Sequence, residues 1–375
     1  MKKISIIVLA LLIIALPIFA GGGGDKAKAG ADSGKLRVVT HVVPRTAEVL
    51  EDTPFWVAQN LGYMAEEGLE LRIDQAFGTT DLRMVATGNA EFCGAGPSYV
   101  LAAIEEGLPI KVVSAYDAIN IWGMCVLTKS PIKDWEDMKN AQAKYGRKLT
   151  VALGDASWEM LVTPTLVAAG VNPKADIEWV VAGENRYIQV AEGRLDMLFS
   201  WPGEAWQLIG QNFDFRYIDG NDVLQTSSNP LTTSLKLIKE EPRVVQGYVR
   251  AMAKGIYFTK YNPEAAAAVS CKQWPNIDVT WKAAVYVQEG RNYQMFGKPG
   301  SAEEKKLLER IGWNWEDKWQ LNVNAALESG VIKKAIPLDQ IYTNEYVDNS
   351  WDRKKVERDA DAYDIASVRA RYKPE

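Results

Sequence analysis

A pattern that occurs twice constrains this chain more than any other feature of its sequence. Residues 86–98 read ATGNAEFCGAGPS, and residues 191–203 read AEGRLDMLFSWPG. In each copy a glycine stands where a helix would end, a short apolar stretch follows, and a proline opens the next segment. Glycine tolerates the left-handed conformation that often ends a helix, and proline is favoured at the first position of one. The two copies therefore predict two α/β lobes of like construction.

Strand-like and helix-like segments alternate around both copies of this pattern. β-Branched and apolar residues fill Leu36–Val43, which is typical of a buried strand, and Thr53-Pro54 has the form of a helix start. A second alternating unit begins near Trp122, and the pattern turns helical after about Leu224. Such alternation indicates parallel-rich sheets flanked by helices, in which ligands bind at the carboxyl ends of the strands.

The order of these segments predicts how the chain is divided between the lobes. Residues 35–118 and 219–375 are expected to form one lobe with a helical C-terminal tail, and residues 119–218 the other. The chain would cross between the lobes near Ala115–Trp122 and Gln211–Leu224, and the paired crossings would act as a hinge. A length of 375 residues suits two such lobes.

The N-terminus has the composition of an export signal. Two lysines precede a stretch from Ile4 to Pro17 that is almost wholly apolar, and the small residue Ala20 follows. An uncleaved membrane anchor is the alternative, but the stretch is short for a spanning helix of about 20 residues. We therefore expect residues 1–20 to be a signal peptide cleaved near Ala20 and residues 21–34 to be a flexible leader. The mature protein would be periplasmic or otherwise extracytoplasmic.

Charge and composition exclude several classes of function. The formal net charge is −5, which disfavours binding to nucleic acid or to anionic membranes. His41 is the single histidine, so a zinc site built from several histidines is excluded. The three cysteines (Cys93, Cys125 and Cys271) are too few for a disulfide framework; buried free thiols are expected, although a Cys93–Cys125 bond is conceivable. We expect no cofactor, no metal and a monomer.

Several stretches resemble a branch of the type II solute-binding proteins, the ABC-importer receptors for sulfonates, nitrate and thiamine pyrimidine precursors. The clearest is PFWVAQNLGYMAEEGLELRI at 54–73, which is similar to the first helix and second strand of that family. The resemblance continues through TGNAEFCGAGPSYVLAAIEEGLPIKVVS (87–114), SPIKDWEDMKN (130–140), LVAAGVNP (166–173), VAEGRLDMLFSWPGEA (190–205), NPEAAAA (262–268) and YTNEYVD (342–348). It implies a two-lobe Venus-flytrap fold, a small-molecule ligand, an ABC-importer permease as partner, and no chemistry on the ligand.

The same resemblance implies which segments line the cleft between the lobes. They are Thr40-His41, Gly78-Thr79-Thr80, Gly96-Pro97-Ser98, Asp155-Ala156-Ser157 and Trp201-Pro202-Gly203-Glu204. Two segments depart from the family. The order Trp-Pro-Gly-Glu replaces the commoner Trp-Glu-Pro, and the turn that contains Ser157 is less rich in serine than in the sulfonate binders. Both departures leave the class of ligand open.

Aromatic and hydroxyl side chains near these segments are the candidate ligand contacts. Aromatic faces stack on flat rings and attract cations, although core packing is the commoner role of tryptophan. The hydroxyls beside predicted helix starts suit an oxyanion or a carbonyl oxygen, or simply cap the helix. His41, toward the end of the first strand, could donate to a ligand or cap the sheet. The candidates are His41, Trp56, Thr79, Thr80, Ser98, Tyr99, Trp122, Ser157, Trp158, Trp201 and Glu204.

The charges expected around the cleft bear on the class of ligand. Asp117, Asp155, Glu159 and Glu204 would make its rim acidic, and no lysine or arginine is expected on a cleft turn, Arg186 being the nearest. A bare sulfonate or nitrate usually needs a cation or many donors. We therefore expect a neutral or cationic, nitrogen-bearing ligand, such as an aromatic heterocycle or a pyrimidine precursor.

Three other functions are carried as alternatives. The first is a receptor for an oxyanion of the sulfonate or nitrate type. The second is a sensor subunit that binds the same ligand and reports to a membrane receptor. The third is an enzyme like the eukaryotic relatives that make the thiamine pyrimidine. Those relatives carry a cysteine cluster and work in the cytosol, whereas this chain has isolated cysteines and an export signal.

Overall fold

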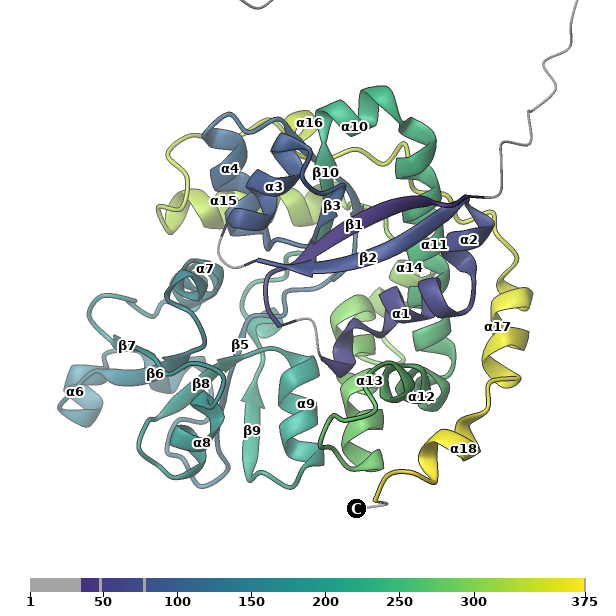
Figure 1. Cartoon of the computed structure of the whole chain (residues 1–375). Helices are drawn as coiled ribbons and strands as arrows, with labels where there is room; N and C mark the ends of the chain where they lie inside the picture. The colour runs from purple at the N-terminus through teal and green to yellow at the C-terminus, as the bar shows by residue number, and fades with distance from the viewer. Residues whose placement is uncertain (1–34, 47–48, 77–78, 374–375) are drawn as a thin grey trace, which may run out of the picture. The chain divides into compact units, whose positions relative to one another are not determined.

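Two five-stranded sheets organise the described part of the chain (Figure 1). The structure is a computed structural model that describes residues 35–46, 49–76 and 79–373. Leu36–Glu375 form one compact unit, which contains both sheets and the helices that cover them. We refer to the first sheet with its helices as the first lobe, and to the second sheet with its helices as the second lobe.

The first sheet is mostly parallel, as the alternating pattern predicts. It consists of β1 (Arg37–Val43), β2 (Leu69–Gln75), β3 (Phe92–Cys93), β4 (Ile110–Ala115) and β10 (Pro230–Ser234). The strand order is β2-β1-β3-β10-β4. β1 pairs in parallel with β2 and β3, which places His41 opposite both Ile73 and Phe92. β10 is antiparallel to β3 and β4.

The second sheet repeats this arrangement. It consists of β5 (Gly123–Leu127), β6 (Leu149–Leu153), β7 (Ile177–Val181), β8 (Met197–Ser200) and β9 (Phe215–Ile218). The order is β7-β6-β8-β5-β9, with β6 parallel to β7 and β8. β5 is antiparallel to β8 and β9. In each sheet, therefore, one strand that arrives by a crossing from the other lobe is inserted antiparallel at the fourth position.

The repeated sequence pattern occupies the same place in each lobe. In the first, α3 (Thr80–Thr87) ends at Gly88 with φ of 78°, and β3 leads into α4 (Pro97–Glu105). In the second, α8 (Arg186–Ala191) precedes Gly193 with φ of 73°, and β8 leads into α9 (Pro202–Gly210). The predicted likeness of the two units is confirmed.

Two crossings connect the sheets, and they run side by side. The first comprises residues 116–122, and the second comprises residues 219–229. Asp117 donates its backbone N–H to the carbonyl of Asn229 at 2.9 Å, and Ser228 donates to the carbonyl of Asp117 at 2.9 Å. The second crossing begins later than the sequence predicts, because β9 occupies part of the expected segment.

Neither β9 nor β10 was expected from the sequence. β9 has only four residues and lies at the edge of its sheet, whereas the Thr-rich β10 is fully buried between two strands without a long apolar run. Short strands of this kind are formed by sheet packing rather than by local pattern. The residue boundaries predicted for the two lobes stay a prediction.

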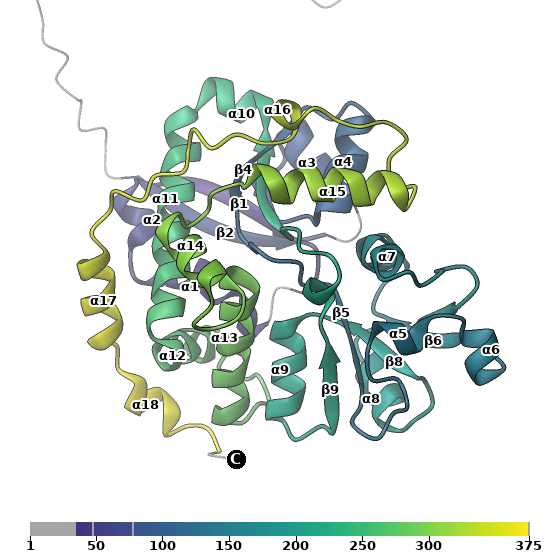
Figure 2. The ribbon, with the colours of Figure 1, turned by 180° about the vertical axis from the view of Figure 1, so that it is seen from behind.

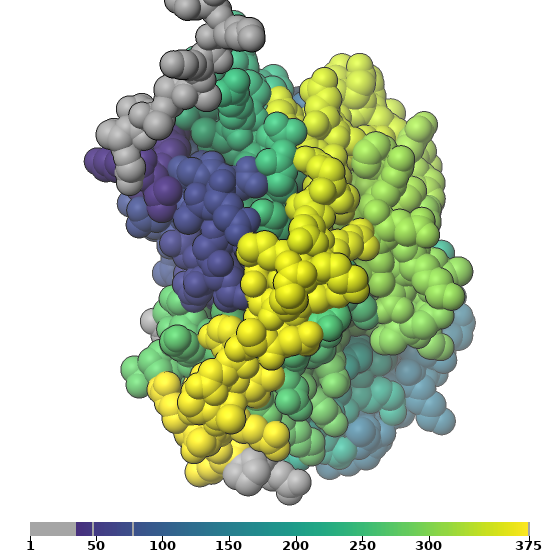
Figure 3. Space-filling view, turned by 90° about the vertical axis from the view of Figure 1, so that its right-hand side faces the viewer, coloured from purple at the N-terminus to yellow at the C-terminus, as the bar shows by residue number. Residues whose placement is uncertain are grey.

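Helices cover both sheets and form the C-terminal tail (Figure 2). The tail turns helical after β10, as predicted, and Figure 3 shows its last segment, in yellow, lying across the surface of the first lobe. The remaining helices are α1 (Thr53–Asn60), α2 (Tyr63–Glu66), α5 (Trp135–Met138), α6 (Ala141–Tyr145), α7 (Glu159–Ala168), α10 (Leu235–Glu240), α11 (Pro242–Tyr261), α12 (Pro263–Gln273), α13 (Trp281–Phe296), α14 (Ala302–Glu309), α15 (Glu316–Glu328), α16 (Leu338–Ile341), α17 (Arg353–Asp361) and α18 (Ile365–Arg369). Short 3₁₀ helices span η1 (Leu50–Asp52), η2 (Ala156–Trp158) and η3 (Gly220–Asp222).

The predicted signal peptide (1–20), the predicted leader (21–34) and Gly78 lie outside the described residues. Within the part that is described, no helix combines the length and the apolar character needed to cross a membrane.

Candidate functional site

A small cavity, the inner cavity, lies between the two lobes. Its volume is about 60 Å³, which is room for a few water molecules. The first lobe contributes His41 from β1, together with residues of η1, α1 and the start of α4. The second lobe contributes Phe199 of β8 and residues that follow β6 and β8. The crossings contribute Tyr116, Ile121, Trp122 and Asn229, and two residues of α13 complete the lining. The cavity therefore lies where the carboxyl ends of parallel strands meet, as predicted for a fold of this class.

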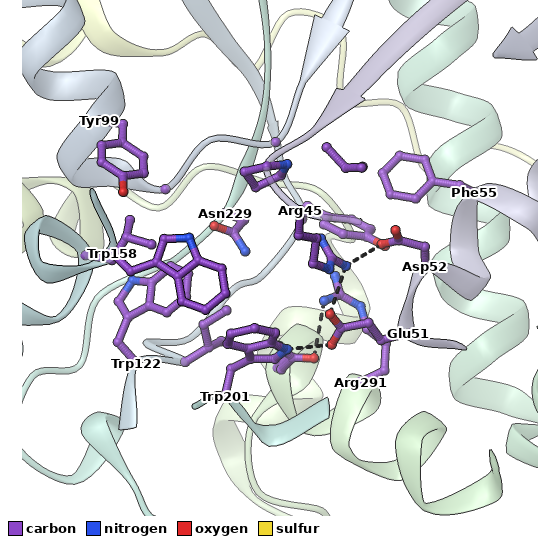
Figure 4. Close-up of a pocket in the computed structure, with 18 of the residues that line it drawn as sticks. Arg45, Glu51, Asp52, Phe55, Tyr99, Trp122, Trp158, Trp201, Asn229 and Arg291 are labelled. Atoms are coloured by element: carbon purple, nitrogen blue, oxygen red, sulfur yellow. Dashed lines mark hydrogen bonds and ion pairs between the residues drawn. The ribbon is translucent and has the colours of Figure 1, made fainter. Parts of the chain in front are cut away.

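One side of the inner cavity is an aromatic wall, which we define as Tyr99, Trp122, Trp158, Phe199 and Trp201 (Figure 4). The ring centroids of Trp158 and Trp201 are 5.7 Å apart, with an interplanar angle of 77°. The centroids of Trp122 and Phe199 are 5.7 Å apart. Trp158, Phe199 and Trp201 pack edge to face, whereas Trp122 is tilted by 36° against Phe199. Edge-to-face packing holds rings in place while leaving faces free to stack on a ligand.

Residues beside the aromatic wall explain how its tryptophans are held. Trp201 precedes the proline that opens α9 and has an extended backbone. Gly154 leaves room for Trp158, because a Cβ there would lie 2.6 Å from the indole ring. Behind both rings lies Arg186, whose guanidinium carbon is 4.9 Å from the Trp158 ring centroid and 5.7 Å from that of Trp201. Arg186 is 2% exposed and pairs with Glu204.

The opposite side of the inner cavity, the charged end, carries two arginines that are already paired (Figure 4). Arg45 Nη2 lies 2.7 Å from Asp52 Oδ1 and 2.9 Å from Glu51 Oε1. Arg291 Nη2 lies 2.7 Å from Asp117 Oδ1. Burial raises the pKa of Asp52 and of Asp117 above the usual aspartate value, although the arginines act in the opposite direction. Two cations therefore face three carboxylates, and neither cation is free.

Several buried polar atoms at the charged end have no hydrogen-bond partner among the described residues. They are Arg45 Nε, Asp52 Oδ2, Tyr116 Oη, Asp117 Oδ1, and the Nε and Nη2 of Arg291. Asp117 Oδ1 and Arg291 Nη2 form an ion pair but not a hydrogen bond. An unsatisfied buried donor or acceptor costs about 1–3 kcal/mol. These atoms are therefore the positions at which a bound molecule would gain most by offering a hydrogen-bonding group.

His41 lines the inner cavity and is neutral. Its Nδ1 is 2.8 Å from the Tyr248 hydroxyl, and its ring centroid is 4.5 Å from that of Phe55. Burial, assisted by the charge of Arg45, lowers the pKa of His41 to about 3. Since Nδ1 is occupied by Tyr248, Nε2 is the ring atom left to face the cavity, where it can bond a neutral group.

Two hydrogen bonds close the inner cavity by joining the lobes directly. Trp201 Nε1 donates to Glu51 Oε2 at 2.7 Å, and the Tyr99 hydroxyl donates to the Ser157 carbonyl at 2.6 Å. The Glu51 carboxylate also lies against the N-terminus of α9, where a Cβ on Gly203 would overlap Glu51 Oε2. A carboxylate is favourable at that end of a helix. A ligand larger than a few waters must separate these contacts to enter.

The structure brings five of the eleven predicted site residues together around the inner cavity. These are His41, Tyr99, Trp122, Trp158 and Trp201. Glu204 lies in an adjoining cavity, which is described below, and Ser98 lines a separate small pocket beside α7.

The other predicted residues do not line the inner cavity. Trp56 is 8% exposed and packs edge-on against Trp274, with ring centroids 5.5 Å apart. Ser157 reaches the cleft through its backbone carbonyl, which accepts from Tyr99. Thr79 and Thr80 stand at the start of α3, outside the lining.

Sequence reasoning missed the charged end. The expectation that no arginine lies on a cleft turn is wrong, because Arg45 follows β1 by two residues. Asp117, expected on an acidic rim, is fully buried against Arg291. The place of Arg45 after a predicted strand was a usable indication. Arg291 had none, because α13 reaches the site only through tertiary packing.

The cysteines and acidic residues do not form a metal centre in the described part of the chain, where no group of three potential ligands is suitably placed. All three cysteines are free and buried, which confirms the expectation of free thiols.

Comparisons with known proteins place this geometry in a family. Residues 50–266, more than half of the chain, match the model of the family described as NMT1/THI5 like. The riboflavin-binding protein RibY of Chloroflexus aurantiacus is 24% identical over 365 residues, which cover 92% of this chain and 99% of that protein. The 4-amino-5-hydroxymethyl-2-methylpyrimidine phosphate synthase of Legionella pneumophila is 23% identical over 235 residues, covering 60% of this chain and 70% of that one.

Solved structures share the fold at lower identity. The periplasmic aliphatic sulphonate-binding protein SsuA of Escherichia coli aligns with a TM-score of 0.56 and 16% identity, over 84% of this chain and 94% of that one. The alkanesulfonate-binding protein SsuA of Xanthomonas axonopodis, bound to MOPS, gives 0.59 and 13%, over 84% and 99%. The desulfurization enzyme DSZB gives 0.51 and 17%, over 84% and 98%. The chain therefore belongs to the NMT1/THI5-like family and has the two-lobe fold of the type II periplasmic binding proteins.

Proposed function

We propose that this protein is an exported receptor that captures a planar, nitrogen-bearing heterocycle between its lobes and delivers it to the permease of an ABC importer. The observation that carries the proposal is the inner cavity, where an aromatic wall faces a charged end whose arginines are already paired. A flat ring gains from stacking on the wall. Ring nitrogens and carbonyls would pair with the unsatisfied atoms of the charged end.

The charges of the site favour such a ligand over a bare oxyanion. A sulfonate or nitrate could accept from Arg45 Nε or Arg291 Nε, but the charges of both arginines are already balanced by Glu51, Asp52 and Asp117. Three carboxylates would then repel it, because like charges in a poorly solvated site are costly. A neutral heterocycle with both donors and acceptors meets no such repulsion.

The relatives narrow the choice of heterocycle. The relative that matches nearly the full length of this chain is named for riboflavin, and the other is named for a pyrimidine phosphate. Riboflavin is therefore our first candidate ligand, and 4-amino-5-hydroxymethyl-2-methylpyrimidine is the second. Both carry a flat ring with several nitrogens, as expected for the aromatic wall.

We propose that the protein releases its ligand chemically unchanged. Burial raises the pKa of the Cys93 thiol well above its usual value and that of Cys271 to about 11, which makes both poor nucleophiles. DSZB and the pyrimidine phosphate synthase show that enzymes occur among proteins of similar fold or sequence. Recovery of intact ligand after long incubation with the protein is the expected result, and catalytic conversion over many turnovers would refute it.

Calorimetric titration with three probes tests the proposed ligand class. We expect stoichiometric binding of riboflavin or of the aminopyrimidine, and no detectable binding of an alkanesulfonate. Tight binding of the sulfonate alone would replace this proposal by that of an oxyanion receptor. Mass spectrometry of small molecules released from gently purified protein provides an independent identification.

Export, partner and oligomeric state belong to the same proposal. The mature chain would start after about Ala20 and act as a monomer beside a membrane permease. The intact mass of protein recovered from the extracytoplasmic fraction should lack residues 1–20, and a mature chain that keeps them would contradict cleavage.

A further inference from the structure

A second cavity, the outer cavity, adjoins the inner one and has a different lining. Its volume is about 290 Å³. Arg45, Glu51, Trp158 and Trp201 line both cavities, and the Trp201–Glu51 hydrogen bond therefore lies at their boundary. A molecule that parts this bond would enter both spaces at once.

The outer cavity offers neutral hydrogen-bonding groups beside the tryptophans. Thr46, Gln207 and Gln211 supply a hydroxyl and two amides. Tyr187 adds a phenol. Side chains of this kind bond readily to hydroxyl groups, since each can both donate and accept.

The charges around the outer cavity are predominantly negative. Four carboxylates line it (Glu51, Glu184, Glu204 and Asp278) against Arg45 and Arg186. Both arginines are already paired. Arg45 pairs with Glu51 and Asp52. Arg186 pairs with Glu204, and Glu184 lies 4.0 Å from Arg186. An added phosphate would meet repulsion and no free cation.

From these two cavities we infer that the ligand has two parts, a flat ring held in the inner cavity and an uncharged polyhydroxylated tail held in the outer cavity, and that the outer cavity rejects the phosphorylated form of the same molecule. The inference rests on the proposed function, since it assumes that a ring occupies the inner cavity. It adds the chemical class of the tail and a basis for discrimination between an alcohol and its phosphate ester.

Three flavins separate the contributions of ring, tail and charge. Lumiflavin carries the ring with a methyl group in place of the tail, riboflavin carries the neutral polyol, and riboflavin 5′-phosphate carries the charged ester. By calorimetry we expect riboflavin to bind about tenfold more tightly than lumiflavin, and the phosphate to bind about tenfold more weakly than riboflavin.

Variants at the exposed rim test the electrostatic part. In the double variant Glu184→Gln/Asp278→Asn, the ratio of the dissociation constants for the phosphate and for riboflavin should fall to about threefold or less. Glu178→Gln is the control, because Glu178, like Glu184, is exposed on the second lobe but lines neither cavity. Its ratio should equal that of the unaltered protein.

The possible failures are distinguishable. Equal affinities for all three flavins would overturn the tail site and leave the ring site standing. Tighter binding of the phosphate than of riboflavin, or a ratio that the double variant does not change, would overturn the rejection of phosphate. Binding of none of the three flavins would overturn this inference, and the aminopyrimidine titration then decides whether the proposed heterocycle receptor survives.

Discussion

Trp201 connects more features of the site than any other residue of the second lobe. Its indole forms part of the aromatic wall, lies near the Arg186 guanidinium, and donates across the cleft to Glu51. Glu51 in turn pairs with Arg45 and abuts the start of α9. Stacking, charge and closure of the lobes therefore meet at one side chain.

Replacement of Trp201 by alanine should affect binding more than folding. We expect Trp201→Ala to weaken riboflavin binding by about 1–3 kcal/mol, because a stacking face of the aromatic wall is lost. Thermal stability should change less, since Trp201 is only partly buried and leaves no sealed cavity. Calorimetric titration beside thermal melting measures both effects.

Trp179→Ala is the matched control for that experiment. Trp179 lies on β7 of the same lobe, is also partly buried, and lines neither cavity. Its loss should lower stability and leave affinity nearly unchanged. Wild-type affinity in a destabilised Trp201→Ala protein would identify Trp201 as a packing residue and remove the main support for a ring ligand.

The buried neutral state of His41 predicts a contribution to acid sensitivity. Its folded pKa of about 3 lies below the value of 6.5 expected when unfolded, so below pH 6.5 the unfolded chain binds a proton that the folded one does not. The contribution of His41 to the free energy of unfolding is fully present above pH 6.5. It falls by about 1.4 kcal/mol per pH unit as the pH drops from 6.5 toward the folded pKa. Carboxyls with raised pKa values, such as Asp81 at about 7, act in the opposite direction.

The comparison with His41→Asn isolates the histidine, because the other groups titrate in both proteins. Urea unfolding between pH 7.5 and pH 5 should show the variant less stable at the higher pH, owing to the smaller buried side chain, with the gap narrowing on acidification. A gap that stays constant over this range would mean that His41 does not titrate as described.

Among the elements, the pair α9 and α13 binds the second lobe to the C-terminal helices (Figure 2). Gly210 and Gly290 permit the close approach. A Cβ on Gly290 would overlap the Pro202 carbonyl oxygen, and one on Gly210 would lie 2.8 Å from Ala283 Cα. α13 also carries Arg291 into the inner cavity, so this packing positions the charged end.

Gly290→Ala tests the close approach of α9 and α13, because the expected change in stability has the opposite sign to that in an unconstrained helix. In an unconstrained helix the change from glycine to alanine stabilises by roughly 0.5–1 kcal/mol. Here the obstacle is backbone, which cannot swing aside, and we expect destabilisation of about 1–3 kcal/mol by chemical denaturation. Ligand binding should weaken as well, since Arg291 would shift. A stabilised variant would show that the helices are free to separate.

At the scale of the whole molecule, two lobes close over a cavity too small for the proposed ligand. The Trp201–Glu51 and Tyr99–Ser157 hydrogen bonds join them, and the paired crossings at Asp117 and Asn229 connect the sheets. Hinge closure about such crossings is a common response of two-lobe binding proteins. The ligand must therefore be admitted by an open state and retained by a closed one.

Small-angle scattering follows this motion directly. The radius of gyration should fall when saturating riboflavin is added, because the ligand favours the closed state. Tyr99→Phe removes one closing hydrogen bond and should lower affinity by about fivefold, roughly 1 kcal/mol, with the lobes still closing at saturation. An unchanged radius of gyration in the unaltered protein would argue against closure around the ligand.

Much of the fold could be predicted from the sequence because its indications are local. The repeated unit ending in Gly88 and Gly193, the prolines that open α4 and α9, and the helical tail depend on near neighbours in the chain. The tryptophans after the second lobe's strands could be placed in the cleft for the same reason. A residue that follows a parallel strand lies at the edge where ligands bind.

Tertiary structure alone decided the electrostatics and the exact lining of the site. Arg45 is neutralised by Glu51 and Asp52 from η1, and Arg291 arrives on a helix distant in sequence, so neither pairing leaves a local pattern. Trp56 shows the converse, since its helix turns it toward Trp274 and away from the cavity. Local periodicity determines which elements form, whereas the packing of all elements together determines which side chains from distant segments share a cavity.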